Sequence, residues 1–132
     1  MNNDLAKYRL ESAKERLASA RLLYENGQYR DSISRSYYAM LSGARALLST
    51  KRLDSSKHSG VISLFNQHFV KTGVLNKEAG KKLASAKEMR EDSDYEDFVV
   101  VSKEDAEKQI IDAENFIQRI EAAILKKCDR SN

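Results

Sequence analysis

The fold is decided by one stretch, residues 29–50, which reads YRDSISRSYYAMLSGARALLST. Its apolar residues recur three and four positions apart, and this spacing places them on one side of an α-helix. The predicted core side consists of Ile33, Tyr37, Met40, Ala44, Leu47 and Leu48. A helix with so long an apolar side needs other helices packed against it, so the stretch predicts a helix bundle.

The opposite side of this helix carries small residues where a solvated side would carry lysine and glutamate. Its members are Ser32, Arg35, Ala39, Ser42, Ala46 and Ser49. Because small side chains let another backbone approach closely, we predict that the helix is buried on both sides. The cover is either another helix of the chain or a second subunit, and on this argument we predict a homodimer. The alternative is that small residues merely suit helix formation.

Helical spacing continues through most of the chain. A first helix is predicted over residues 4–25, with Leu5, Tyr8, Ala13, Leu17, Ala20 and Tyr24 on its apolar side and a stop at Asn26-Gly27. A third follows the N-cap candidates Ser55 and Ser56 and ends near Thr72. A fourth, capped by Asn76, reaches Arg90, and residues 91–101 are predicted to form a connector. Ser102 and Asp105 resemble a capping box that opens a last helix, in which Ala106, Ile110, Ala113, Ile117, Ile120 and Ile124 form an apolar stripe.

Composition agrees with this pattern and limits the classes of protein. The 132 residues include no proline and five glycines, and 33% of them are charged, which favours long helices over a turn-rich β fold. We expect a single all-α domain over residues 1–132, an antiparallel four- or five-helix up-down bundle. No apolar run approaches the roughly 20 residues of a membrane helix, and Cys128 is the lone cysteine. We therefore expect a cytoplasmic protein with no membrane partner.

Motifs for most cofactor and metal chemistry are missing from the sequence. It contains no P-loop, no GxGxxG, no HExxH and no CxxC, and His58 and His68 have no ligand set at metal-binding spacing. We expect neither a metal site nor a cofactor. His58 stands at the predicted start of the third helix, where a capping or packing role is the expected one.

Two groups of residues are candidates for anion binding. Residues 1–60 hold eleven Lys and Arg against six Asp and Glu, and in this part Arg35, Tyr38 and Arg45 share a helix side. Guanidinium groups bind phosphate in a bidentate manner, and a phenol can stack on a base. The second group is Arg90, Asp94 and Tyr95. The alternatives are a buried structural ion pair for Arg35, and for the second group a salt bridge from Arg90 to Asp94 that only tethers the connector.

These stretches together resemble the HEPN (higher eukaryotes and prokaryotes nucleotide-binding) domains of small stand-alone prokaryotic proteins. The resemblance lies in residues 34–40 (SRSYYAM), 44–48 (ARALL), 57–60 (KHSG), 64–65 (LF), 68–73 (HFVKTG), 90–95 (REDSDY) and 113–117 (AENFI). It implies a helical bundle that commonly dimerises and is often encoded beside a minimal nucleotidyltransferase as a toxin–antitoxin-like pair. Nucleotides or RNA are the implied ligands.

Many members of that family are metal-independent endoribonucleases with an Arg-x4–6-His motif. In this chain tyrosine (Tyr95) follows Arg90 at the required spacing, and serine (Ser42) follows Arg35. Arg52 and His58 also have the required spacing, but they lie before the later helices in which the family's motif occurs, so we treat this match as coincidence. A phenol with a pKa near ~10 is a poor general base at neutral pH. We therefore predict a non-catalytic, nucleotide- or RNA-associated partner of a small nucleotidyltransferase. The alternatives are a ribonuclease toxin that uses Arg90 and Tyr95 as candidate catalytic residues, and a scaffolding bundle.

Overall fold

The computed structural model describes residues 3–95 and 100–130, with the side chains of Tyr95 and residues 128–130 left out. Five α-helices and one π-helical turn make up this part of the chain, and it contains no strand. Their bounds are α1 Asp4–Glu25, α2 Tyr29–Ser49, α3 His58–Phe65, the π-helical turn η1 Asn66–Val70, α4 Lys77–Tyr95 and α5 Lys103–Arg130. The all-α prediction is confirmed.

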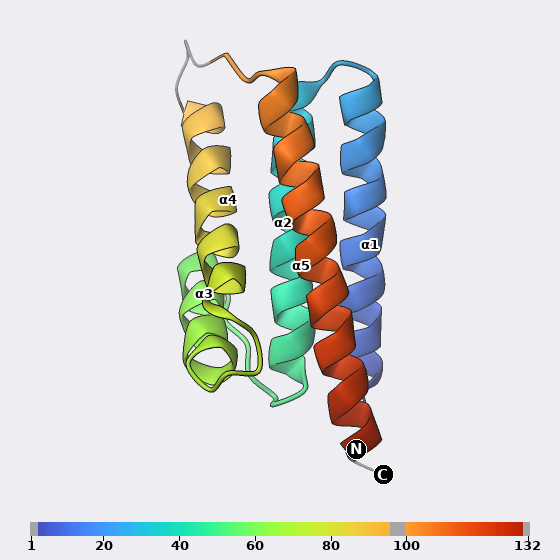
Figure 1. Ribbon diagram of the computed structural model, residues 1–132, viewed down its shortest axis with the longest axis vertical. Helices are drawn as coiled ribbons and strands as arrows, with labels where there is room; N and C mark the ends of the chain where they lie inside the picture. Colours follow the sequence, from blue (N-terminus) through green and yellow to red (C-terminus); the bar gives the residue numbers. More distant parts are fainter. Residues whose placement is uncertain (1–2, 96–99, 131–132) are drawn as a thin grey trace.

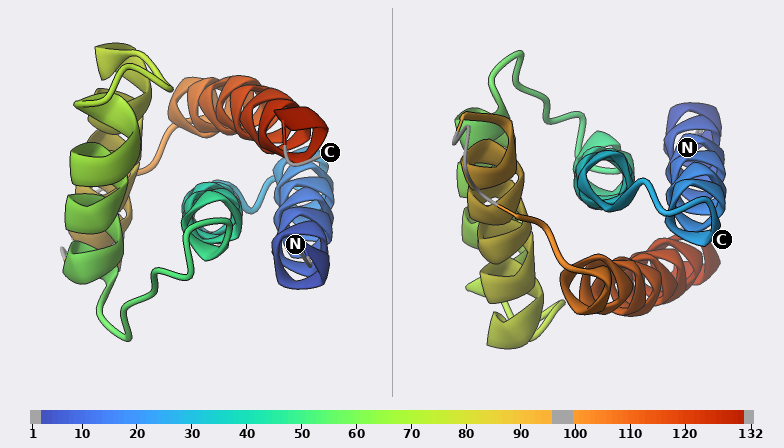
Figure 2. Two further views of the ribbon diagram at one scale, coloured as in Figure 1. Left: turned by 90° about the horizontal axis from the view of Figure 1, so that it is seen from below. Right: turned by 90° about the horizontal axis from the view of Figure 1, so that it is seen from above.

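The long helices run alternately up and down the bundle, and α3 packs beside the lower half of α4 (Figure 1). Helix α2 is central. Seen along the bundle, it has α1 on one side, α5 on a second side, and α3 with α4 on a third (Figure 2). All six residues of its predicted core side are buried, as that central position requires.

The small residues of α2 pack against α1 of the same chain. The Ser32 hydroxyl donates to the Ala20 carbonyl at 2.8 Å, and Ser32, Ala39 and Ala46 are completely buried. In the antiparallel register that this bond sets, Ala13 lies opposite Ala39. The prediction that α2 is buried on both sides is confirmed for these residues. The cover is a helix of the bundle, however, so this side of α2 does not supply a dimer contact.

The apolar stripe of α1 differs from the predicted one near the N-terminus. Leu5 and Tyr8 are 52% and 71% exposed, so their assignment to the core was wrong. The buried stripe instead consists of Ala6, Leu10, Ala13, Leu17 and Ala20. Three alanines spaced seven residues apart match the small residues of α2 and allow the two backbones to approach, whereas Leu5 and Tyr8 lie outside this stripe.

Two of the predicted helix starts have the expected caps, and one does not. The Asn76 side-chain oxygen accepts from the Ala79 N–H at 3.0 Å, and the Ser102 hydroxyl accepts from the Asp105 N–H at the same distance. Ser55 does not cap α3, which begins at His58; its hydroxyl accepts from the Lys57 N–H within the preceding loop. The third predicted helix also changes to π-helical geometry at residues 66–70 before it ends.

Helix α4 extends beyond its predicted end at Arg90 and continues to Tyr95. Two ion pairs, each between residues one helical turn apart, support the extension. Lys87 Nζ lies 2.7 Å from Glu91 Oε1, and Arg90 Nε lies 3.0 Å from Asp94 Oδ2. The predicted connector therefore begins later, and its residues 96–99 lie outside the described part of the chain. In that described part, no helix is long and apolar enough to cross a membrane.

Candidate functional site

The fourth side of α2, which faces away from α5, has none of the described helices over it (Figure 2). The α2 residues on this side follow one another at helical spacing and are exposed or half-buried: Arg35, Tyr38, Ser42, Arg45 and Ser49. We call this surface the open side of α2. It holds three of the residues that the sequence predicted to bind an anion.

The two groups of residues predicted separately from the sequence meet at this surface. The guanidinium carbon of Arg90, on α4, lies 5.3 Å from the centroid of the Tyr38 ring, on α2. Arg90 also forms the predicted ion pair with Asp94. A cation over an aromatic ring at this distance is attracted by the ring quadrupole. Tyr38, Arg90 and Asp94 therefore belong to one site, in which Arg90 takes the place beside the Tyr38 phenol that was predicted for Arg35.

His58 completes this cluster. The Tyr37 hydroxyl lies 3.1 Å from His58 Nδ1, and the Tyr38 and His58 rings meet edge to face with centroids 5.7 Å apart. The prediction that His58 only caps or packs a helix missed this contact. No spacing rule relates residues 21 positions apart, and the only sequence signal was the family-like stretch at residues 57–60. Arg52, the arginine at motif-like spacing, has no described contact with His58.

The cluster has a defined protonation state at neutral pH. Partial burial, together with the positive charges of Arg45 and Arg90, holds the pKa of His58 below its ordinary value of 6.5. Burial and the neighbouring Tyr38 raise the pKa of Tyr37 to about 12. At pH 7 the site therefore contains a neutral imidazole and a protonated phenol. Tyr37 can then donate to Nδ1, which leaves the His58 proton on Nε2.

Two arginines act on this cluster, Arg90 over the Tyr38 ring and Arg45 through its charge near His58, and each has a donor that no acceptor among the described residues uses. Arg45 Nη2 donates to the Ser55 carbonyl at 3.2 Å, and Arg90 is held by Asp94. Even so, the buried Nε–H of each arginine makes no hydrogen bond within the described residues; that of Arg90 is close to Asp94 but is not directed at it. A buried donor without an acceptor costs about 1–3 kcal/mol. An anion at this site would supply acceptors.

Other predicted residues lie apart from the cluster. Arg35 is exposed on the open side, and none of its described contacts joins it to Tyr38 or Arg45. Ser42 is half-buried on the same side. Tyr95 ends α4, but its side chain lies outside the described part, so its role in the site stays a prediction.

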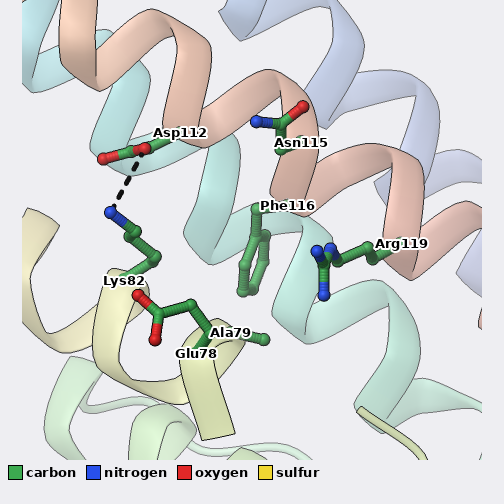
Figure 3. A pocket seen from close by; sticks show the side chains of 7 residues that line it. All are labelled: Glu78, Ala79, Lys82, Asp112, Asn115, Phe116 and Arg119. Atoms are coloured by element: carbon green, nitrogen blue, oxygen red, sulfur yellow. Dashed lines mark ion pairs between the residues drawn. The ribbon is translucent and has the colours of Figure 1, made fainter. Parts of the chain in front are cut away.

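A hollow lies between α4 and α5 and contains none of the predicted site residues. It has a volume of about 140 Å³ and is lined by Glu78, Ala79, Lys82, Asp112, Asn115, Phe116 and Arg119. Figure 3 shows the Phe116 ring in the middle, with the Lys82–Asp112 ion pair (3.5 Å) on one side and Arg119 on the other. Carboxylates farther round α5 are paired too, Glu114 with Arg21 and Glu121 with Lys14, each at 2.6 Å. Much of the charge around α5 is thus neutralised locally.

Comparison with known proteins gives the family. The HEPN domain matches residues 6–123, which is most of the chain. The chain belongs to the HEPN domain family. The family-like stretches in the sequence thus identified it correctly, and four of them supply Tyr38, Arg45, His58 and Arg90 to the cluster on the open side of α2.

Relatives of this HEPN protein come from archaea and bacteria. A Methanocaldococcus jannaschii protein named as a candidate toxin is 39% identical over 115 residues, which cover 87% of this chain and 85% of the relative. A UPF0332 protein of Thermotoga maritima is 40% identical over 120 residues, 91% of each chain. A UPF0332 protein of Archaeoglobus fulgidus is 34% identical over 123 residues, which cover 93% of this chain and 98% of the relative. The match extends over nearly the whole bundle in each case.

Proposed function

We propose that this HEPN protein is the toxin-like member of a toxin–antitoxin-like pair and binds RNA through phosphates at the open side of α2. The observation that carries the proposal is the position of the Arg90 guanidinium over the Tyr38 ring, with His58 in contact with Tyr38 and Arg45 on the same open side of α2. Guanidinium groups bind phosphate oxygens, and the Tyr38 and His58 rings offer surfaces on which a base can stack. The name of the Methanocaldococcus relative supports the toxin-like role.

Two partners belong to the same proposal. The first is a small nucleotidyltransferase, the antitoxin-like member of the pair. The second is another copy of the chain, because the open side of α2 is the one side of this central helix that no described helix of the bundle covers. Light scattering at micromolar concentration tests the second: a mass of 15.0 kDa contradicts the homodimer.

The test of RNA binding compares arginines on two sides of the bundle. Arg45→Ala and Arg90→Ala are each expected to weaken binding of a short single-stranded RNA about tenfold, since each removes a guanidinium that binds phosphate. The slope of log affinity against log salt should become shallower by about 0.7 for each phosphate that is no longer neutralised. Arg119→Ala, which removes the same charge beside the α4–α5 hollow, is the matched control and should change little. Equal reductions in affinity for all three variants would mean that only net charge matters, and the site would be rejected.

The second candidate function is metal-independent cleavage of RNA, and His58 favours it. A non-catalytic role was predicted because both arginine-anchored motifs lack a histidine, yet the fold places one beside Arg90. In the tautomer that carries its proton on Nδ1, facing the Tyr37 oxygen, the neutral imidazole can take the proton of a 2′-hydroxyl on Nε2 as the 2′-oxygen attacks the phosphorus. The 5′-oxygen then leaves with a proton from the imidazolium, which gives a 2′,3′-cyclic phosphate and a 5′-hydroxyl. Arg45 and Arg90 would stabilise the charge that develops on the phosphate.

One assay separates the two candidates. RNA is incubated with the purified protein and EDTA, beside His58→Ala and Tyr37→Phe variants that are first shown to be folded by circular dichroism. Cleavage that His58→Ala loses and Tyr37→Phe weakens would establish the catalytic function. RNA that stays intact while the wild type binds it would leave binding as the function.

A further inference from the structure

A carboxylate lies between two arginines beside the candidate site. Asp54, in the loop between α2 and α3, has its Oδ2 atom 3.0 Å from Arg9 Nη2 and its Oδ1 atom 4.0 Å from Arg45 Nε. The Ser55 N–H donates to Oδ1 at 2.8 Å. Arg9 also reaches the Arg45 main chain, where its Nη1 donates to the carbonyl at 3.4 Å. Two guanidinium groups from α1 and α2 thus hold one anion, which is part of the protein.

The carboxylate is held firmly enough to be ionised and loosely enough to be replaced. Although partial burial opposes it, the Ser55 N–H and the Arg9 guanidinium hold the pKa of Asp54 below its ordinary value. Its side chain is nevertheless 54% exposed, and ion pairs that open to solvent contribute only about 0–1 kcal/mol. A shallow pocket of about 470 Å³ opens here, lined by Arg45, Asp54, Ser55 and Ser56.

We propose that Arg9 and Arg45 form a further phosphate site, which Asp54 occupies in the free protein and from which an RNA phosphate displaces it. Each of the two non-bridging oxygens of an RNA phosphate can accept from more than one N–H, so Arg9 and Arg45 can bind the group together, including through the buried Arg45 Nε–H that lacks an acceptor among the described residues. The inference rests on the proposed RNA binding at the open side of α2. It adds Arg9 to the binding residues and gives Asp54 the role of a competitor.

The first experiment measures the affinity of a fluorescent single-stranded RNA for four variants. Asp54→Asn is expected to tighten binding about threefold or more, since the competing charge is removed. Asp31→Asn is the matched control. Asp31, on α2, is exposed as Asp54 is, but no described ion pair joins it to Arg9 or Arg45. Arg9→Ala should weaken binding, and in the Arg9→Ala/Asp54→Asn double variant the gain from Asp54→Asn should disappear. A gain no larger than that of Asp31→Asn, or one that survives Arg9→Ala, would overturn the inference.

The second experiment does not depend on RNA. Inorganic phosphate is titrated into the wild-type protein while the Ser55 amide resonance is followed by NMR, because displacement of Asp54 breaks the hydrogen bond from that amide. A saturable shift that Arg9→Ala abolishes supports the site even if RNA does not bind, in which case only the proposed function fails. The absence of any shift at Ser55, with Arg90→Ala still weakening RNA binding, would reject the Asp54 site alone.

Discussion

Two adjoining sides of α2 differ in how deeply their residues are buried and in what covers them. Ser32, Ala39 and Ala46 are completely buried against α1, whereas Tyr38, Ser42 and Arg45 are half-buried on the open side. At 100° per residue the two sets lie on neighbouring arcs of the helix, yet Ser42 and Ala46 were predicted to share a single small-residue side. The difference shows that small size alone does not identify the covered side, because Ser42 and Ser49 lie on the open side. The arginine and tyrosine residues are what mark the side that none of the described helices covers.

The largest effect that should separate these sides comes from placing one carboxylate on each. Ala46→Glu puts an unpaired charge into a completely buried position and should cost about 3–5 kcal/mol of the free energy of unfolding, enough to unfold a marginal domain. Ser42→Glu lies on the open side and should change stability by about 0.5 kcal/mol or less. Thermal and urea denaturation followed by circular dichroism measure both. Similar decreases in stability for the two variants would show that the open side is also tightly covered.

This pair of substitutions also corrects an expectation from the sequence. Ser42 and Ala46 were assigned to one small-residue side with a second subunit as a possible cover, and on that assignment a glutamate at either position would dissociate a dimer. With α1 as the cover, Ala46→Glu becomes a folding defect. Ser42→Glu remains a probe of the open side, where its negative charge should weaken RNA binding.

Local patterns predicted most of the helices, and their failures have local causes. The bounds of α1 and α2 and the stripe of α5 follow from apolar spacing and the Asn26-Gly27 stop, where Gly27 has a φ of 76°. Residues 91–95 were assigned to a connector because they are acidic. Pairing with lysine and arginine one turn earlier keeps them helical.

The site was predicted in pieces because its contacts are not local. Arg45 and Arg90 were identified from residue type, but no sequence pattern shows that Arg90 packs on Tyr38 across two helices. His58 was missed for the same reason: it reaches Tyr37 only because the loop after α2 brings the start of α3 back beside the middle of that helix. Contacts of this kind depend on the packing of whole helices.

The pH dependence of stability tests the environment of His58 on the open side. Because its pKa is lower in the folded state than the ordinary 6.5, the unfolded chain binds the proton first as pH falls. The folded state should therefore lose stability as the pH drops from about 6.5 through the lower folded pKa, and this loss should be absent at pH 7.5. Thermal midpoints at pH 7.5 and pH 5.5 are compared for the wild type and His58→Gln. If the glutamine variant loses as much stability as the wild type between these pH values, the lowered pKa of His58 and its attribution to burial and the charges of Arg45 and Arg90 are contradicted.

The smallest effect concerns the side of α2 that faces α5, where Gly43 packs. A methyl group added there would lie 3.7 Å from the nearest atoms of Phe116 and Ile120, which is ordinary contact. Since glycine lowers helix stability by up to about 1 kcal/mol relative to alanine, Gly43→Ala should stabilise the protein by up to about that amount.

Gly80→Ala is the matched comparison in α4, because its new methyl would lie 2.5 Å from Asn66 Oδ1 and Asn66 would have to move. We expect Gly80→Ala to be about 1 kcal/mol less stable than Gly43→Ala, measured by urea denaturation. Equal stability of the two variants would mean that Asn66 moves away from the new methyl at little cost. A decrease in stability for Gly43→Ala would mean that α5 packs on α2 as closely as α1 does.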